Sequence, residues 1–281
     1  PDHKLLAYAV DDKGSELYTV RIRDLATGKD LADVIPGTKY SGASWAPDGR
    51  TIAFESNRDG EAAVYTIRPD GSGLTRLTPI GTPGEQPNWS ADGRQLVYTS
   101  RREGVAQLYL MKLDGSDGPA LPGTTNGFLA AFSPDGRRLL FAAQGKRPSN
   151  QDRVFVMHPD GSNRRPLGDL SKSNEDPRWS IDGTRVVFTE VPLLEKLPTE
   201  APRDFVRRRA QAQRLVSVTP DGLDPRALRP EERDRITRDR GLSPDAKWLV
   251  YSKLVEGVTG LYVQERSSGT ERLIDRGSHR P

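Results

Sequence analysis

The chain of 281 residues contains no cysteine and only 3 histidines. The absence of cysteine excludes disulfides, thiolate nucleophiles and Cys-ligated zinc. No run of about 18 apolar residues occurs, which excludes a membrane-spanning helix of the usual kind. Charge is also nearly balanced, with 42 Lys and Arg against 39 Asp and Glu, so the net charge of +3 argues against a dedicated nucleic-acid-binding protein.

One pattern of about ten residues recurs along the chain. It consists of an aromatic residue, two small residues, Asp-Gly, a polar residue and then a short, mostly apolar run. The copies are Trp45–Phe54, Trp89–Tyr98, Phe132–Phe141, Trp179–Phe188 and Leu242–Tyr251, and the second half of a sixth copy opens the chain. The copy at Leu242 has leucine in place of the aromatic residue and Asp-Ala in place of Asp-Gly. The aspartates of the pattern are Asp2, Asp48, Asp92, Asp135, Asp182 and Asp245.

A second strand-like pattern follows each first one and ends in another turn, as in Pro159-Asp-Gly-Ser162. Asp-Gly supplies the positive φ of tight hairpin turns, and the segments between the turns are short and rich in Val, Leu, Tyr and Phe. Each unit is therefore a four-stranded antiparallel meander of about 40 to 45 residues, a length typical of a propeller blade. We expect the aromatic residue of each pattern to pack between blades.

The predicted fold class is all-β: a six-bladed β-propeller of four-stranded antiparallel blades, with a short helical insertion in blade 5. The whole chain, 1–281, forms one such propeller. The blades are approximately 1–38, 40–79, 84–122, 126–168, 174–229 and 237–274. Because blade 1 begins at the turn of Asp2, its innermost strand is missing. We expect the tail 275–281 to close the ring near Asp2 and His3.

The pattern Ser/Ala-Pro-Asp-Gly-Arg, followed by a strand and Pro-Asp-Gly-Ser, resembles the TolB-type propeller repeat over nearly the whole chain. Blade 1, with Tyr18–Lys29 and Ile35–Gly42, is similar to the propeller of prolyl-oligopeptidase-type peptidases. The TolB-type resemblance implies a protein or peptide partner. The peptidase resemblance implies no activity here, since Gly-x-Ser-x-Gly, which the catalytic domain of that family requires, does not occur.

Propellers commonly bind ligands around the mouth of the central channel. In a meander the residues three and four positions before each motif aromatic enter one mouth, together with the links between blades. We expect ligand-binding residues there. They are Tyr40, Glu85, Gln86, Phe128, Glu175, Asp176, Arg238 and Asp239. This ring has several carboxylates, which could hold a cation or a Lys or Arg side chain. Solvated residues with partners across the channel are the structural alternative.

The interval of 63 residues between Asp182 and Asp245 is longer than the others and locates an insertion. It falls between the second and third strands of blade 5, at the same end as the mouth. We expect Thr199 to cap a helix that runs to about Gln213, with Glu200 in its first turn. Its arginines could bind an acidic patch or a phosphate of a partner. They are Arg203, Arg207, Arg208 and Arg209, with Arg214 following. A solvated helix that shields the blade is the alternative.

These features favour a non-catalytic binding or scaffolding propeller that recognises a protein or peptide at the mouth. No catalytic residues are assigned, because His3, His158 and His279 are far apart and neither a phosphate-binding loop nor a dinucleotide fingerprint occurs. No cofactor is expected. Two other functions stay open: a stand-alone propeller hydrolase or lyase that uses carboxylates at the mouth, and the propeller of a peptidase whose catalytic domain is absent.

We expect a monomer with no nucleic-acid partner, in the periplasm, at the cell envelope or secreted. The chain begins at Pro1 without methionine, so we expect that the native start is missing and that a signal peptide or an upstream domain could have preceded it.

Overall fold

The computed structural model describes most of the chain. The described residues are 5–10, 18–24, 27, 29–68, 72–145, 151–194, 199, 201–229, 232, 248–255, 258–265 and 267–276. The predictions that concern Asp2, Arg238, Asp239, Asp245 and the closing tail beyond residue 276 lie outside these residues.

Antiparallel meanders make up the fold, since strands that are adjacent in sequence pair with each other. The first sheet contains β1 (Leu5–Val10), β2 (Tyr18–Asp24), β3 (Asp30–Trp45), β4 (Ile52–Ser56), β5 (Ala63–Ile67) and β6 (Thr75–Arg76). The second contains β7 (Glu85–Trp89), β8 (Gln95–Ser100) and β9 (Gln107–Lys112). The third contains β10 (Gly127–Phe132), β11 (Leu139–Gln144), β12 (Asp152–Met157) and β13 (Arg165–Leu167).

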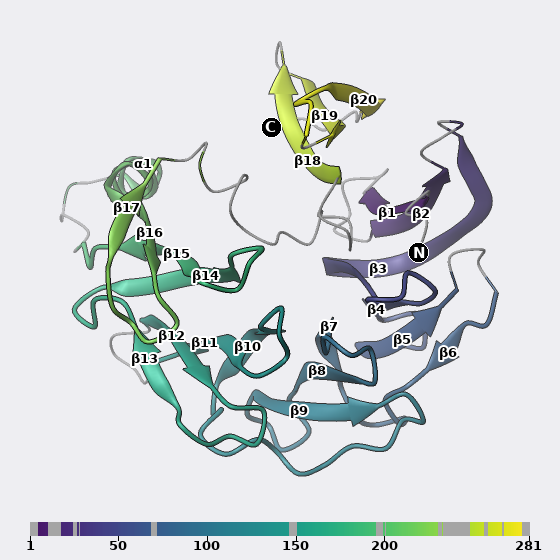
Figure 1. The fold of residues 1–281 in the computed structure, drawn as a ribbon, viewed down its shortest axis with the longest axis horizontal. Coiled ribbons are helices and arrows are strands. Elements are labelled where there is room, and N and C mark those ends of the chain that lie inside the picture. Colours follow the sequence, from purple (N-terminus) through teal and green to yellow (C-terminus); the bar gives the residue numbers. More distant parts are fainter. Residues whose placement is uncertain are drawn as a thin grey trace.

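The fourth sheet contains β14 (Ser173–Trp179), β15 (Val186–Val191), β16 (Arg214–Val218) and β17 (Arg226–Leu228). The fifth contains β18 (Trp248–Val255), β19 (Val258–Glu265) and β20 (Glu271–Arg276). Figure 1 shows the sheets around a common centre, with β7, β10 and β14 toward the centre and β6, β13 and β17 toward the outside. The predicted all-β fold of antiparallel sheets is confirmed, and the third and fourth sheets have the predicted four strands.

The first sheet departs from the predicted division into units because β3 is 16 residues long. Its first half pairs with β2, where Val20 faces Ile35, and its second half pairs with β4, where Ala43 faces Phe54. The predicted boundary between residues 38 and 40 therefore falls inside a continuous strand. Two predicted units share β3 and form one six-stranded sheet.

The Asp-Gly turns that follow β7, β10 and β14 are held by a repeated set of hydrogen bonds. Ser133 Oγ donates to Asp135 Oδ1 at 2.5 Å, and the backbone N–H of Arg137 donates to the same oxygen at 3.0 Å. The Arg138 N–H donates to Ser133 Oγ at 2.9 Å, and Gly136 has a φ of 71°. The Ser133 hydroxyl is the main reason why the pKa of Asp135 lies below its usual range. The same arrangement surrounds Asp92 and Asp182.

Two of the motif tryptophans join their sheets to the preceding ones, as the sequence predicted. Trp89 Nε1 donates to the Ser44 carbonyl at 2.9 Å, and Trp179 Nε1 donates to the Ala131 carbonyl at 3.2 Å. Trp179 also packs with apolar residues of the preceding sheet, including Leu140. Because each ring is buried at a seam between sheets, the repeated tryptophan links neighbouring units rather than filling the interior of one.

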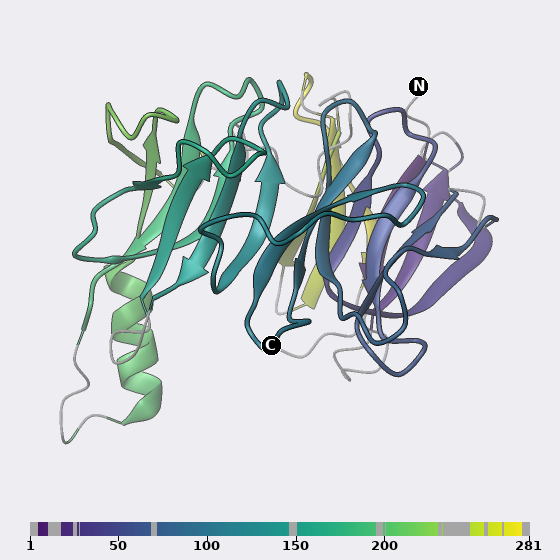
Figure 2. The same cartoon turned by 90° about the horizontal axis from the view of Figure 1, so that it is seen from below.

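The predicted helix is α1 (Pro202–Ala212), which lies between β15 and β16. The prediction that Thr199 caps it is wrong, since the N-cap is Ala201 and makes no side-chain capping bond. The reason is Pro202: its fixed φ suits the first turn of a helix and sets the start there. Asp204 is the acidic residue of the first turn. Figure 2 shows the green helix next to the strands of the fourth sheet and extending beyond their ends.

Candidate functional site

Five of the predicted mouth residues lie in the first part of an inner strand: Glu85, Gln86, Phe128, Glu175 and Asp176. In the register, Glu85 faces Thr99 and Glu175 faces Thr189, which are equivalent places in two sheets. The turns of Asp92 and Asp182 follow the other ends of β7 and β14. Strands β7, β10 and β14 all begin at the same end of their sheets, and we call this end the mouth end. Helix α1 connects the end of β15 to the beginning of β16. Both of these places are next to the beginning of β14, so the insertion is also at the mouth end.

Each of these inner strands carries a bulge at the same repeat position. Gln86, Leu129 and Asp176 have φ values of 56°, 52° and 51°, a left-handed conformation that is uncommon for residues other than glycine. The pairing register shifts at each of the three places. Bulges of this kind redirect side chains and are frequent next to functional sites.

Gln86 connects three sheets. Its backbone N–H donates to Glu55 Oε2 of β4 at 3.2 Å, and its side-chain Oε1 accepts the N–H of Leu129 of β10 at 2.8 Å. Asn88 Oδ1 likewise accepts the N–H of Phe132 at 3.4 Å. Side chains of β7 thus satisfy backbone groups on the inner edge of the next sheet. This structural role of Gln86 was not foreseen from the sequence, and its part in ligand binding stays a prediction.

Glu175 meets the basic helix. Arg209 Nη2 donates to Glu175 Oε1 at 2.5 Å, and Ser173 Oγ donates to the same oxygen at 3.0 Å. The structure therefore brings together one predicted mouth residue and one predicted insertion residue. The ion pair fixes the inner side of α1 to the beginning of β14.

Asp152, at the beginning of β12, completes this group and was not singled out from the sequence. Its backbone N–H donates to Ser173 Oγ at 3.0 Å. Burial, followed by repulsion from Glu175, raises the pKa of the Asp152 carboxyl, and Arg209 opposes this rise. No motif marks Asp152, because its neighbours in space come from another sheet and from the helix.

A buried carboxylate binds the residue at which the chain re-enters the fourth sheet after the insertion. Glu190, 3% exposed at the end of β15, accepts hydrogen bonds from Arg214 Nε at 2.5 Å and from Lys172 Nζ at 3.2 Å. Lys172 also pairs with Asp169 at 3.0 Å. Arg214, which the sequence analysis grouped with the helix arginines, thus belongs to β16 and neutralises the charge of the Glu190 carboxylate.

The other predicted mouth residues do not join the group of Glu175 and Arg209. Asp176 pairs with Arg178 of its own strand at 3.2 Å. Glu85 and Phe128 are half-buried at the beginnings of β7 and β10. Tyr40 lies within β3, and Arg238 and Asp239 are outside the described residues. Among the helix arginines, Arg208 lies over the ring of Phe205, at 5.5 Å from its centroid.

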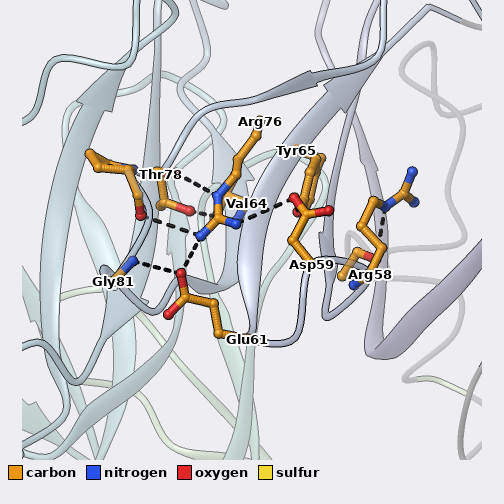
Figure 3. A network of polar contacts seen from close by, with 10 residues as sticks. Arg58, Asp59, Glu61, Val64, Tyr65, Arg76, Thr78 and Gly81 are labelled. Atoms are coloured by element: carbon orange, nitrogen blue, oxygen red, sulfur yellow. Dashed lines mark hydrogen bonds and ion pairs between the residues drawn. The ribbon is translucent and has the colours of Figure 1, made fainter.

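A second polar network occupies the mouth end of the first sheet (Figure 3). The Arg76 guanidinium lies between two carboxylates, with hydrogen bonds to Asp59 Oδ2 at 3.3 Å and to Glu61. Glu61 also accepts the Gly81 N–H at 2.7 Å, which is the main reason for its lowered pKa. Tyr65 donates its hydroxyl to Asp59 at 2.6 Å. The network links the loop before β5 to the segment after β6. Its charged groups therefore pair with one another and stabilise these loops.

Within the described ranges, no group of three or more His, Asp or Glu side chains is placed to hold a metal ion. The same residues include no helix that is long and apolar enough to cross a membrane.

Radial antiparallel meanders with loops gathered at the mouth end define a β-propeller. The family model described as "TolB beta propeller domain" matches residues 1–193. The chain therefore belongs to the TolB beta propeller domain family.

Relatives of different function share this similarity. The chain is 40% identical over 67 residues to the "Tol-Pal system protein TolB" of Syntrophus aciditrophicus, a match that covers 23% of the chain and 15% of that protein. It is 29% identical over 133 residues to "Dipeptidyl-peptidase 5" of Porphyromonas endodontalis, covering 43% of the chain and 15% of that protein. These matches span only a small part of each curated relative.

Among solved structures, TolB from Acinetobacter baumannii matches with a TM-score of 0.64 and 16% identity, over 99% of this chain and 65% of that one. An oligogalacturonate lyase in complex with manganese matches with a TM-score of 0.59 and 16% identity, over 98% of this chain and 74% of that one. At these identities the similarity shows the fold alone.

Proposed function

We propose that the chain is a non-catalytic binding or scaffolding module, a six-bladed propeller that recognises a protein or peptide at the mouth end. The observation that carries this proposal is the meeting of Glu175 and Arg209, because it joins the longest insertion to an inner strand at the same end of rigid sheets. Variable loops on a rigid scaffold are where binding residues concentrate. The match to a Tol-Pal system protein supports a partner that is itself a protein.

The remaining parts of this proposal follow from the sequence. The protein would act as a monomer, without nucleic acid, in the periplasm, at the cell envelope or in a secreted form. The half-buried Glu85 and Phe128 and the exposed part of Asp176 would face the ligand, while Glu175 is engaged by Arg209. A cation at the mouth is not required by this function.

Site-specific photo-crosslinking tests the proposal. A photoreactive phenylalanine analogue at position 128 is at the mouth end, and the same analogue at position 137 is in the turn at the other end. In cells that produce the natural gene product, position 128 is expected to give a discrete protein adduct that Glu85→Gln and Asp176→Asn weaken. Equal adducts at both positions, or none at 128, would move the site away from the mouth end.

The second candidate is the propeller of a peptidase, which the match to a dipeptidyl-peptidase over 133 residues favours. In such an enzyme a separate domain with Gly-x-Ser-x-Gly carries the nucleophile, and the propeller lies beside it. The sequence of the complete gene discriminates the two functions. A Gly-x-Ser-x-Gly domain in the same reading frame would favour the peptidase.

A further inference from the structure

Helix α1 has an outer side that no described part of the chain covers. None of its residues is buried, and Val206 has 64% of its surface exposed. Figure 2 shows the helix extending past the ends of the neighbouring strands. A helix whose residues are all solvated gains little from packing and is marginal at this length. The ion pair of Arg209 with Glu175 at 2.5 Å is a clear anchor.

The arginines of α1 divide into two groups. Arg209 faces the sheet and its charge is matched by Glu175. Arg203 and Arg207, which are exposed, are four residues apart and therefore neighbours on one face, with Val206 beside them. In the part of the chain that the structure describes, neither of them forms an ion pair. The outer face thus presents two unmatched positive charges, about 6 Å apart along the helix, around one exposed apolar side chain.

We infer that this outer face of α1 docks an acidic amphipathic segment of a protein partner, with carboxylates one helical turn apart and an apolar residue that covers Val206. Charge complementarity selects the acidic partner, and the pairing of charges at i and i+4 selects a helical one. The inference rests on the proposed protein-binding role but not on the mouth residues, so it defines a second contact surface.

Other anionic partners fit the face less well. A nucleic-acid surface requires many phosphate contacts for useful affinity, whereas only two arginines are unmatched here. A membrane surface requires a broad apolar face, whereas Val206 is the one large hydrophobic of α1 with a mostly exposed surface.

The test uses the full chain and a fluorescein-labelled helical peptide with glutamates spaced i, i+4 around leucines, measured by fluorescence anisotropy at physiological salt. The matched control peptide has glutamine in place of each glutamate. We expect the chain to bind the glutamate peptide about threefold to tenfold more tightly than the glutamine peptide, because two solvent-exposed ion pairs add modestly to affinity. Equal binding of the two peptides would overturn the inference.

Three variants locate the binding. Arg203→Glu with Arg207→Glu is expected to weaken the glutamate peptide at least about tenfold. Arg94→Glu with Arg137→Glu makes the same change of charge in exposed turns at the other end and should leave binding unchanged. If both double variants weaken peptide binding equally, the attraction comes only from the net charge of the protein and the inference fails. Tighter binding of duplex DNA or of anionic phosphatidylserine vesicles than of the peptide would also overturn it.

The third variant separates this inference from the proposed function. Glu85→Gln with Asp176→Asn removes mouth charges and leaves the outer face of α1 intact. Peptide binding should not change in this variant, whatever the crosslinking at position 128 shows. Loss of peptide binding in it would place the acidic segment at the mouth and overturn the second surface.

Discussion

Replacing Trp179 by phenylalanine tests the seam between the third and fourth sheets. The substitution keeps an aromatic ring in a site that is 3% exposed, but it removes the hydrogen bond from Nε1 to the Ala131 carbonyl. A lost hydrogen bond that leaves a buried acceptor without its partner costs about 1–2 kcal/mol. The smaller ring also leaves a void beside Leu140, which adds about 1 kcal/mol. We therefore expect Trp179→Phe to lower the free energy of unfolding by about 2–3 kcal/mol.

Trp45→Phe is the matched control because Trp45 holds the same repeat position, is only half-buried, and has no hydrogen-bond partner among the described residues. It should cost less than about 1 kcal/mol. Urea unfolding followed by circular dichroism measures both, since the substitutions alter tryptophan fluorescence. Equal losses in the two variants would show that the indole hydrogen bond does not stabilise the seam.

Three further predictions concern single residues. Gly168→Ala places a Cβ 2.7 Å from the Phe188 ring at a φ of 82° and should lower the free energy of unfolding in urea by about 2–4 kcal/mol. Gly104→Ala, with open space at a φ of 77°, should lower it by about 1 kcal/mol, and similar losses in the two variants would refute the clash. The carboxyl of Asp152 has a raised pKa in the folded protein, so its contribution to stability is present below the unfolded pKa and is lost as the pH rises through the folded pKa. Unfolding curves recorded across this pH interval should therefore show Asp152→Asn gaining stability relative to the parent as the pH rises, and a difference independent of pH would contradict this. Ser133→Ala removes the hydroxyl that lowers the pKa of Asp135 and should cost about 1 kcal/mol at neutral pH; the stability contributed by this lowered pKa is lost as the pH falls through it, so a cost that persists undiminished in acid would argue against the turn network.

Local features of the fold were predictable from the sequence because local chemistry determines them. Asp-Gly permits the positive φ of Gly136, and the recurring tryptophan marks the seams, as Trp89 and Trp179 show. The helix was predicted near its true position. Its start was wrong because Pro202 sets the first turn more strongly than Thr199 could have capped it.

The site was less predictable, because its contacts depend on which sheets become neighbours. Nothing around Asp152 in the sequence indicates that Glu175 lies close to it. The long strand β3 was missed for a similar reason: the link between two units becomes continuous only when both halves find partner strands, β2 and β4. Gln86 was predicted as a ligand-binding residue, and its contact with the Leu129 N–H adds a role that only the assembled sheets reveal.

Most of the hydrogen bonds between neighbouring sheets that are described above run in one direction. In five of them the donor belongs to the later sheet and the acceptor to the earlier one: Trp89 to Ser44, Gln86 to Glu55, Leu129 to Gln86, Phe132 to Asn88 and Trp179 to Ala131. The bond from the Asp152 N–H to Ser173 Oγ runs the opposite way. The two flanks of a sheet therefore differ, and the contacts between sheets are head-to-tail rather than self-complementary. Because a flank is complementary to the opposite flank and not to a copy of itself, the units are compatible with addition or circular permutation of whole repeats in the same direction but not with inversion of one repeat.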